Sequence, residues 1–112
     1  MYERTVKLSY KDGIVDEIIN QIIDILKKYI KTPFKLYIFG SFATGNATIY
    51  SDLDLALETE ENLDKKTLFK IKEDIENIKT LRKIDFLYLN QLEGKIKETV
   101  KKEGIKIYEF TG

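Results

Sequence analysis

The sequence contains no cysteine and no histidine. Without cysteine, the chain has no disulfide, no thiolate zinc site and no cysteine nucleophile. Without histidine, it also lacks the commonest general base and the commonest transition-metal ligand of proteins. The strong metal ligands that remain are carboxylates, which favour hard cations such as Mg²⁺. Metal binding and acid–base chemistry in this chain are therefore expected to depend on aspartate and glutamate.

The chain also lacks a dominant charge, a long apolar run and a recognisable leader. Its 19 basic residues balance 19 acidic ones, so no overall field favours nucleic acid or a membrane surface. No apolar run approaches the length of a membrane span, and the N-terminus has no signal-peptide pattern. We therefore expect a cytoplasmic protein that binds neither membranes nor nucleic acid directly.

A chain of 112 residues has the size of one domain with one core, so residues 1–112 are expected to form a single unit. Residues 1–8 form a short leading segment whose sequence is compatible with an extended backbone. The apolar periodicity then predicts a helix, two strands, a helix, a strand, a helix and a strand. This order indicates an α/β (α+β) domain with one mixed sheet of about four strands and three main helices. The predicted helices cover about 12–31, 68–78 and 91–103, and the predicted strands cover 34–39, 52–58, 84–89 and 105–110.

The ends of these elements carry recognisable signals. Ser9 and Asp12 have the spacing of a capping box before the first helix, and Pro33 closes that helix. Gly104 stops the last helix. The strand 105–110 alternates like an exposed or edge strand, which offers an edge for self-pairing or a partner. The first helix carries an apolar stripe expected to cover a sheet face: Ile14, Val15, Ile18, Ile19, Ile22, Ile23, Leu26, Tyr29 and Ile30.

A glycine-containing loop follows the first long strand. Gly40 lets the backbone approach a phosphate closely, and Ser41 adds a hydroxyl and an N–H at a possible helix start. Residues 42–45 could form one helical turn, and Gly45 permits the tight turn after it. The loop therefore indicates a phosphate-binding segment, although a Gly-Ser turn after a strand commonly ends the strand without binding a ligand.

Two carboxylates follow this loop. Asp52 and Asp54 are one residue apart, so in a strand they project from the same face. Two like charges side by side are unfavourable unless a cation lies between them, which predicts a metal site. Asp85 lies in an otherwise apolar strand and needs a partner. It is the candidate third carboxylate, able to bind the metal and to accept a proton from an incoming hydroxyl.

Simpler roles remain open for the residues around these carboxylates. Asp85 could form a structural ion pair with Arg82 or Lys83. Ser51 is expected to cap the loop by a local hydrogen bond rather than act as a nucleophile. Phe42 and Tyr50 are expected to pack the loop against the sheet.

The spacing of these residues resembles a known signature. Gly40-Ser41, three residues, Gly45, five residues and then Ser51-Asp52-Leu53-Asp54-Leu55 is similar to the motif of the polymerase-β-like nucleotidyltransferase superfamily. The chain length resembles its minimal nucleotidyltransferase (MNT) branch, which contains the antitoxins of HEPN/MNT toxin–antitoxin pairs. The resemblance extends over nearly the whole chain, including the later strand aspartate and the closing helix, glycine and strand.

This resemblance implies a nucleotidyltransferase fold and a set of roles. ATP would be the co-substrate, and two Mg²⁺ ions would be bound by carboxylates. The residues implied in nucleotide binding are Gly40, Ser41, Gly45 and Ser51. Those implied in catalysis and metal binding are Asp52, Asp54 and Asp85.

One position departs from the family pattern. Many minimal members have a basic residue just before the second glycine, where this chain has Thr44. Lysines of the last helix could supply a phosphate contact instead, although a solvated helix face is their commoner role. These lysines are Lys95, Lys97, Lys101 and Lys102.

Larger relatives append a helical domain that binds the acceptor, whereas this chain stops after the catalytic core. The acceptor is therefore expected on another polypeptide or in a groove between subunits of a homodimer or hetero-oligomer. The resemblance implies a HEPN RNase toxin as partner, because similar MNT antitoxins transfer AMP from ATP to a tyrosine of such a toxin. The alternatives are a binding antitoxin or scaffold that neutralises its partner by contact, and a nucleotidyltransferase for a small molecule such as an aminoglycoside.

Overall fold

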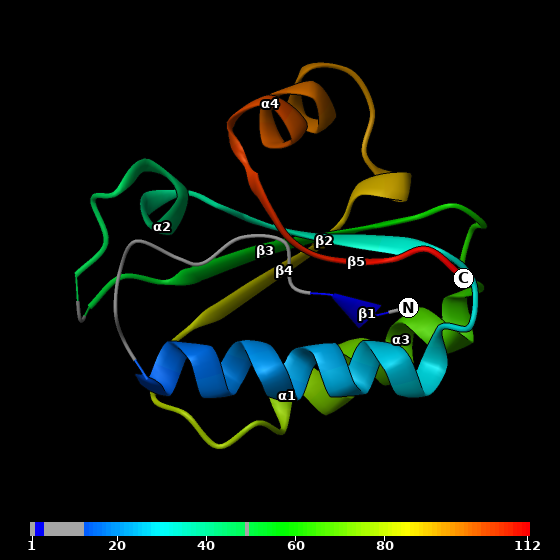
Figure 1. Ribbon diagram of the computed structural model, residues 1–112, viewed down its shortest axis with the longest axis horizontal. Helices are drawn as coiled ribbons and strands as arrows, with labels where there is room; N and C mark the ends of the chain where they lie inside the picture. Colours follow the sequence, from blue (N-terminus) through cyan, green and yellow to red (C-terminus); the bar gives the residue numbers. More distant parts are fainter. Residues whose placement is uncertain (1, 4–12, 49) are drawn as a thin grey trace.

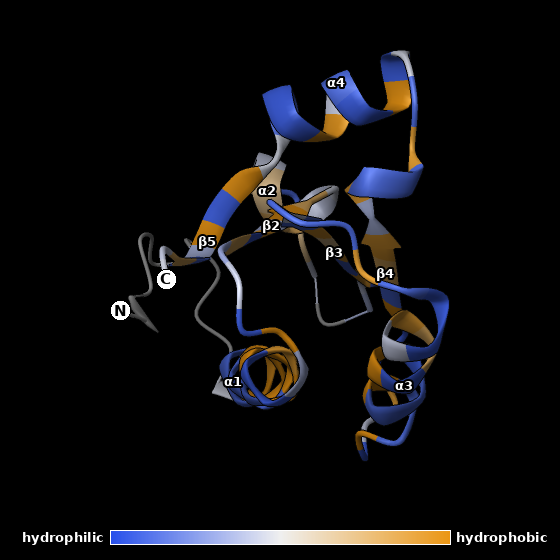
Figure 2. Cartoon of the chain, turned by 90° about the vertical axis from the view of Figure 1, so that its right-hand side faces the viewer, coloured by the Kyte–Doolittle hydropathy of each residue, from blue (hydrophilic) through white to orange (hydrophobic). Residues whose placement is uncertain are grey.

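The computed structural model of the chain describes residues 2–3, 13–48 and 50–112. They form one mixed β-sheet with two longer helices on one face and a shorter helix on the other (Figures 1 and 2). This architecture confirms the predicted α/β fold. The strands are β1 (Tyr2–Glu3), β2 (Phe34–Phe39), β3 (Leu53–Thr59), β4 (Ile84–Tyr88) and β5 (Ile105–Phe110). The helices are α1 (Gly13–Tyr29), α2 (Ser41–Thr44), α3 (Lys65–Glu76), the 3₁₀ turn η1 (Leu89–Gln91) and α4 (Lys95–Glu103).

The strands lie in the order β1-β5-β2-β3-β4. The central strand β2 is antiparallel to both β3 and β5. In contrast, β3 and β4 are parallel, and α3 forms the crossover that a parallel pair requires. This parallel pair starts both strands at the same end of the sheet, which brings the residues that precede and begin them together.

The prediction that 105–110 is an edge strand is wrong for the C-terminal end of β5. There, β1 pairs with β5 in an antiparallel register that aligns Tyr2 with Phe110 and Glu3 with Glu109. The contacts of β5 do not alternate strictly, because the register with β2 shifts between Leu36 and Tyr37. At this bulge the adjacent residues Ile107 and Tyr108 both belong to the main core, and Lys106 and Glu109, three residues apart, form an ion pair of 2.6 Å. The alternating sequence was therefore not the sign of an unpaired edge.

The main core lies between the sheet and the two helices α1 and α3. The α1 stripe is buried as predicted except near its two ends, where Ile14 is 63% exposed and Tyr29 is partly buried. Ile14 lies in the first turn, in the same row as the exposed Gln21 and the half-buried Ile25, and so at the margin of the stripe. The sheet residues of this core are Phe34, Leu36, Ile38, Leu53, Leu55, Leu57, Tyr88, Ile107 and Tyr108.

A smaller apolar cluster covers the opposite face, where Tyr37, Ala56, Leu89 and Val100 pack together. Its helix, α4, begins at Lys95 rather than at the predicted residue 91. The reason is Gly94, whose φ of 65° interrupts the helix and leaves residues 89–91 as a 3₁₀ turn.

The helix ends agree in part with the sequence signals. Gly104 ends α4 in an extended conformation, and a Cβ there would lie 2.5 Å from the Val100 carbonyl oxygen. The Asp64 carboxylate accepts a 2.7 Å hydrogen bond from the backbone N–H of Thr67 and so caps α3. The capping box predicted from Ser9 and Asp12 lies outside the described residues. Within the described ranges, none of the helices is long and apolar enough to cross a membrane.

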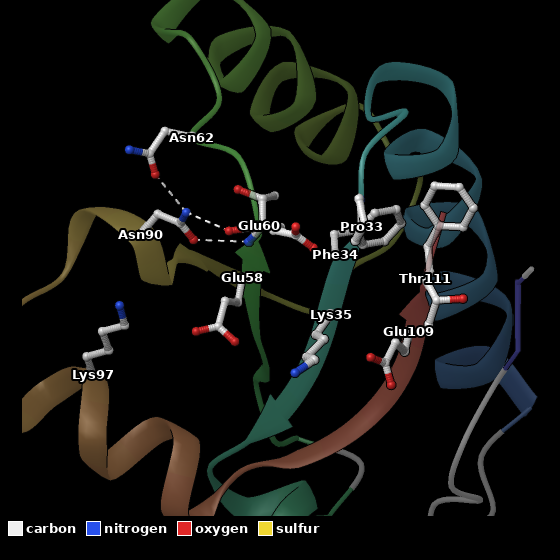
Figure 3. Close-up of a pocket in the computed structure, with 12 residues that line it drawn as sticks. Pro33, Phe34, Lys35, Glu58, Glu60, Asn62, Asn90, Lys97, Glu109 and Thr111 are labelled. Atoms are coloured by element: carbon white, nitrogen blue, oxygen red, sulfur yellow. Dashed lines mark hydrogen bonds between the residues drawn. The ribbon is translucent and has the colours of Figure 1, made fainter.

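The end of the sheet formed by the start of β2 and the end of β3 contains a hollow of about 510 Å³ (Figure 3). Asn90 joins two segments beside it. Its side-chain oxygen accepts from the N–H of Thr59 at 3.0 Å, and its amide nitrogen donates to the Thr59 carbonyl at 2.8 Å. The same nitrogen donates to the side chain of Asn62 at 2.8 Å. Asn90 thus satisfies the last backbone groups of β3.

We expect Asn90→Ala to lower the free energy of unfolding by about 2 kcal/mol, because it removes two hydrogen bonds to the partly buried backbone of Thr59. Urea denaturation measures this change. Asn20→Ala, at an exposed position of α1, is the control and should change the stability by less than about 0.5 kcal/mol. Equal stability of the two variants would contradict the structural role given to Asn90.

Candidate active site

The end of β2 and the start of β3 bring Gly40 against Asp54. The residue before Gly40, Phe39, is the register partner of Asp54. Gly40 has φ 69° and ψ −147°, a conformation that residues with a side chain rarely adopt. A Cβ at Gly40 would overlap the Asp54 carboxylate and lie 3.2 Å from its Cγ. Glycine is therefore needed here both for its conformation and for the close approach to the carboxylate.

The parallel pair β3–β4 brings two carboxylates together. Asp54 and Asp85 are register partners in neighbouring strands. Partial burial, a hydrogen bond with Asp85 and the negative charge of Asp85 raise the pKa of Asp54 to about 6. The charge of Asp52 raises this pKa further, while Lys83 opposes the shift. Asp54 therefore keeps its proton at a pH where an isolated aspartate would be ionised.

Asp52, unlike Asp54, lies outside the strand. It precedes β3, which begins at Leu53 rather than at the predicted residue 52, and its side chain is exposed. The predicted alternation nevertheless holds along β3, where Leu53, Leu55 and Leu57 are fully buried. Asp52 is close enough for its charge to act on Asp54, so all three predicted carboxylates lie at one end of the sheet.

The carboxylates fit a hard divalent cation in their chemistry. Carboxylate oxygens are the ligands that Mg²⁺ favours, and a cation held by Asp54 would favour the ionised form of this carboxyl group. Within the described ranges, however, no three acidic side chains are close enough together to form a metal-binding group as they stand. The geometry presents a carboxyl pair with Asp52 beside it. Joint metal binding by all three stays a prediction.

Asp85 also makes the ion pair that the sequence left open. Lys83 Nζ lies 3.7 Å from Asp85 Oδ1, so Lys83 has this role. Both side chains are substantially exposed, at 68% and 43%, and such a pair contributes little to stability. The ion pair leaves Asp85 accessible at the end of the sheet.

The loop after Gly40 has the predicted helical turn, observed as α2. The N–H groups of Ala43 and Thr44 both donate to the Gly40 carbonyl at 3.1 Å. Gly45 ends the turn with φ 82°. Phe42 is buried as predicted, at 2% exposure. Thr44, in place of the basic residue, donates its hydroxyl to the Ser41 carbonyl at 3.4 Å.

The loop before Asp52 is closed by its own hydrogen bonds. The Ser51 hydroxyl accepts from the Thr48 N–H at 2.8 Å, and the Ser51 N–H donates to the Thr48 carbonyl at 3.1 Å. This confirms Ser51 as a local cap. The expectation that Tyr50 packs the loop is wrong, because Tyr50 is 87% exposed. It occupies the outer corner of the turn that these bonds close.

Arg82 has a role that the sequence did not indicate. Its Nη1 donates to the Ser51 carbonyl at 2.6 Å, and its guanidinium lies 5.5 Å from the centre of the Phe42 ring. Arg82 thus connects the residue before Asp52 with the helix after Gly40. Only the tertiary structure brings these three segments together, so no local pattern could have revealed the contact.

Two lysines of the last helix, Lys97 and Lys101, lie away from the proposed phosphate site. Lys101 binds Glu58 at 2.9 Å, four residues along β3 from Asp54, or roughly 13 Å at strand spacing. Lys97 lines the hollow at the far end of the sheet (Figure 3). Both lysines therefore serve the opposite part of the molecule.

Comparison with known families matches residues 20–110 to the family described as polymerase beta, nucleotidyltransferase. The match covers most of the chain, including the Gly40 loop and all three carboxylates. The chain belongs to the polymerase-β nucleotidyltransferase family. A Methanocaldococcus jannaschii relative, named as a proposed protein adenylyltransferase, is 32% identical over 77 residues, which cover 66% of this chain and 88% of the relative.

Solved structures show that this nucleotidyltransferase shares its fold with MNT antitoxins. One is a toxin–antitoxin complex with AMP-PNP, at a TM-score of 0.62 and 23% identity, covering 78% of this chain and 69% of the other. Another is a tri-AMPylated HEPN toxin of Shewanella oneidensis in complex with its MNT antitoxin. That match has a TM-score of 0.60 and 20% identity, and it covers 81% of this chain and 69% of the other.

We expect Gly40→Ala to lower the free energy of unfolding of this nucleotidyltransferase by about 3 kcal/mol, because it adds both backbone strain and an overlap with Asp54. Gly45→Ala isolates the strain, since Gly45 has φ 82° but open space around its Cβ position; we expect a loss of about 1 kcal/mol. Gly13→Ala, with neither feature, should be neutral or slightly stabilising. Urea denaturation that ranks the three variants otherwise would contradict this geometry.

The raised pKa of Asp54 predicts a specific pH dependence of stability in EDTA. Between pH 3.8, the ordinary value, and about 6, Asp54 binds more protons in the folded than in the unfolded state. Stability from this group therefore falls as pH rises through that window. Asp54→Asn removes the effect and should be more stable than the wild type at pH 7 by about 1 kcal/mol, since the carboxylate is partly solvated, or about 4–8 °C in Tm.

Thermal unfolding of both proteins from pH 4 to pH 8 measures this difference. Asp64→Ala provides the opposite case, because the hydrogen bonds from Thr67 hold the pKa of Asp64 below its usual range. The advantage of the wild type over that variant should therefore shrink as pH falls. A difference between wild type and Asp54→Asn that does not change with pH would refute the raised pKa of Asp54.

Proposed function

We propose that this protein transfers AMP from ATP to a tyrosine hydroxyl of a HEPN-type toxin and thereby acts as an antitoxin. The observation that carries the proposal is the Asp54–Asp85 carboxyl pair, held against the Gly40 loop at one end of the sheet. Membership of the nucleotidyltransferase family supports the reaction class. The fold shared with MNT antitoxins supports the biological role.

In this proposal, different residues of the chain bind the phosphates and the metal. The backbone of Gly40 and Ser41 holds the phosphates of ATP, while Gly45 and Ser51 shape the loop around them. Asp52, Asp54 and Asp85 would hold Mg²⁺. When bound, Mg²⁺ neutralises the charge of the triphosphate and assists departure of pyrophosphate.

Asp85 has a second part in the proposed reaction. The acceptor oxygen bonds to the α-phosphorus, the bond from that phosphorus to pyrophosphate breaks, and the hydroxyl proton passes to Asp85. The chain has no histidine to serve as base, and Asp85 is accessible beside Asp54. Asp85 is also the hydrogen-bond partner of Asp54, so it lies next to a proposed metal-binding carboxylate, where a base is needed.

The comparisons support a protein acceptor. The Shewanella oneidensis toxin in complex with an MNT antitoxin is AMPylated three times, and the archaeal relative bears the name of a protein adenylyltransferase. Neutralisation by contact alone is the second candidate. It is favoured by the exposed position of Asp52 outside a compact three-carboxylate group among the described residues, and by Thr44 in place of a basic residue.

Incubation with ATP labelled at the α-phosphate, Mg²⁺ and a HEPN-type partner tests the proposal. We expect label on the partner, and loss of its RNase activity. Asp54→Asn should lower the labelling rate about 100-fold or more, because several kcal/mol of charge stabilisation are lost. Asp24→Asn, an exposed carboxylate on α1, is the control and should label normally.

The outcomes separate the candidate functions. ATP labelled at the γ-phosphate should transfer no label, since pyrophosphate leaves. If Asp54→Asn labels the partner as fast as the wild type, the proposed catalytic role is wrong. If the partner is neutralised without any label, the contact mechanism replaces adenylyl transfer.

A further inference from the structure

A second hollow, of about 550 Å³, opens beside Asp52. Its walls come from the start of α1, residues 50–52 before β3, and residues 79–83 before β4. These segments meet at the end of the molecule where β3 and β4 begin (Figure 1). The volume lies within the ~300–1,000 Å³ typical of binding sites. Unlike the hollow at the far end of the sheet, it includes one of the proposed catalytic carboxylates.

The walls of this hollow gather exposed apolar side chains. Among residues 13–48 and 50–112, five large apolar side chains are strongly exposed. Three of them line this hollow: Ile14 at 63%, Tyr50 at 87% and Leu81 at 108% exposure. The other two, Phe69 and Ile96, lie on α3 and α4. Exposed apolar side chains gathered from separate segments mark an interaction surface.

The charges around these side chains are mainly positive. Lys79, Arg82 and Lys83 line the hollow, against the single carboxylate of Asp52. Arg82 and Lys83 also contact the site itself, through the Ser51 carbonyl and Asp85. An apolar surface with excess positive charge is complementary to a protein segment that carries apolar and acidic side chains. Tyrosine and arginine, both present here, are typical of the central residues of protein interfaces.

We propose that this hollow is the docking surface for the partner protein segment that carries the acceptor tyrosine. The inference rests on the proposed function and adds to it the place and the chemistry of the acceptor: apolar side chains flanked by acidic ones. The position of the hollow supports this occupant. Gly40 lies on the β2 side of β3, whereas residues 79–83 lead into β4, on the other side. The hollow shares Ser51 with the proposed nucleotide loop, and Lys83, which lines it, forms the ion pair with Asp85. A segment docked there would therefore lie next to both the nucleotide and Asp85.

Leu81→Ser and Tyr50→Ser in the full chain test the surface. Both side chains are exposed, so the variants should unfold at the same temperature as the wild type to within a few degrees. We expect each to weaken binding of the HEPN-type partner, measured without ATP by calorimetry, by about tenfold or more. The KM for the partner should rise correspondingly, while the KM for ATP should stay within about twofold. The matched controls are Phe69→Ser and Ile96→Ser. They remove exposed apolar side chains that lie elsewhere on the surface and should leave partner affinity unchanged.

The outcomes distinguish this inference from the proposed function. If the wild type labels the partner and both Leu81→Ser and Tyr50→Ser bind it normally, the docking surface is wrong while the proposed function stands. If the wild type binds the partner without labelling it and the two variants bind weakly, the surface stands and the proposed function fails. A rise in the KM for ATP alone would assign the hollow to the nucleotide. A wild-type dimer that Leu81→Ser dissociates, with normal partner affinity, would assign it to a second copy of the chain. Either of these last results overturns the inference.

Discussion

The forced proximity of two carboxyl groups on neighbouring parallel strands is the constraint on which the candidate site depends. Asp54 and Asp85 are register partners, so they cannot separate without disrupting the sheet. Partial burial and their mutual interaction raise the pKa of Asp54 to about 6. The parallel pairing that causes this needs the α3 crossover, and α3 is held by the same core that buries α1. The packing of the apolar helix faces thus places two carboxyl groups, those of Asp54 and Asp85, side by side at the end of the sheet.

The acidic residues at the two ends of the sheet are paired at different distances. At the far end, Glu58 and Glu109 are bound by lysines at 2.9 and 2.6 Å. At the near end, Gly40 is pressed against Asp54, and the ion pair of Asp85 with Lys83 is longer, at 3.7 Å. Short ion pairs neutralise acids where no chemistry is proposed. Where chemistry is proposed, the fold leaves a carboxyl pair that a divalent cation would stabilise.

Periodicity and local signals were enough for most of the fold and for the carboxylates. The stripe of α1 and the alternation of Leu53, Leu55 and Leu57 follow from short-range rules. The need for glycine at position 40 follows only in part, because its close approach to Asp54 is a tertiary contact. The exposure of Ile14 and Tyr50 could not be predicted in this way, because burial depends on what lies opposite a residue. The contacts of Arg82 were equally inaccessible, since they join segments that only the tertiary structure brings together. These three residues line the hollow beside Asp52, so the part of the site that sequence reasoning missed is the part proposed to receive the partner.

The central claim is that Asp54, placed beside Asp85, keeps its proton to an unusually high pH and that a divalent cation displaces this proton. The most direct test follows the ¹³C chemical shifts of both carboxyl groups by NMR as a function of pH, without and with Mg²⁺. The account predicts a midpoint for Asp54 near pH 6 in the metal-free protein, and a clearly lower midpoint when Mg²⁺ is present, because the cation stabilises the ionised form. A midpoint near the ordinary aspartate value of about 4 under both conditions, or one near 6 that Mg²⁺ does not change, would contradict it.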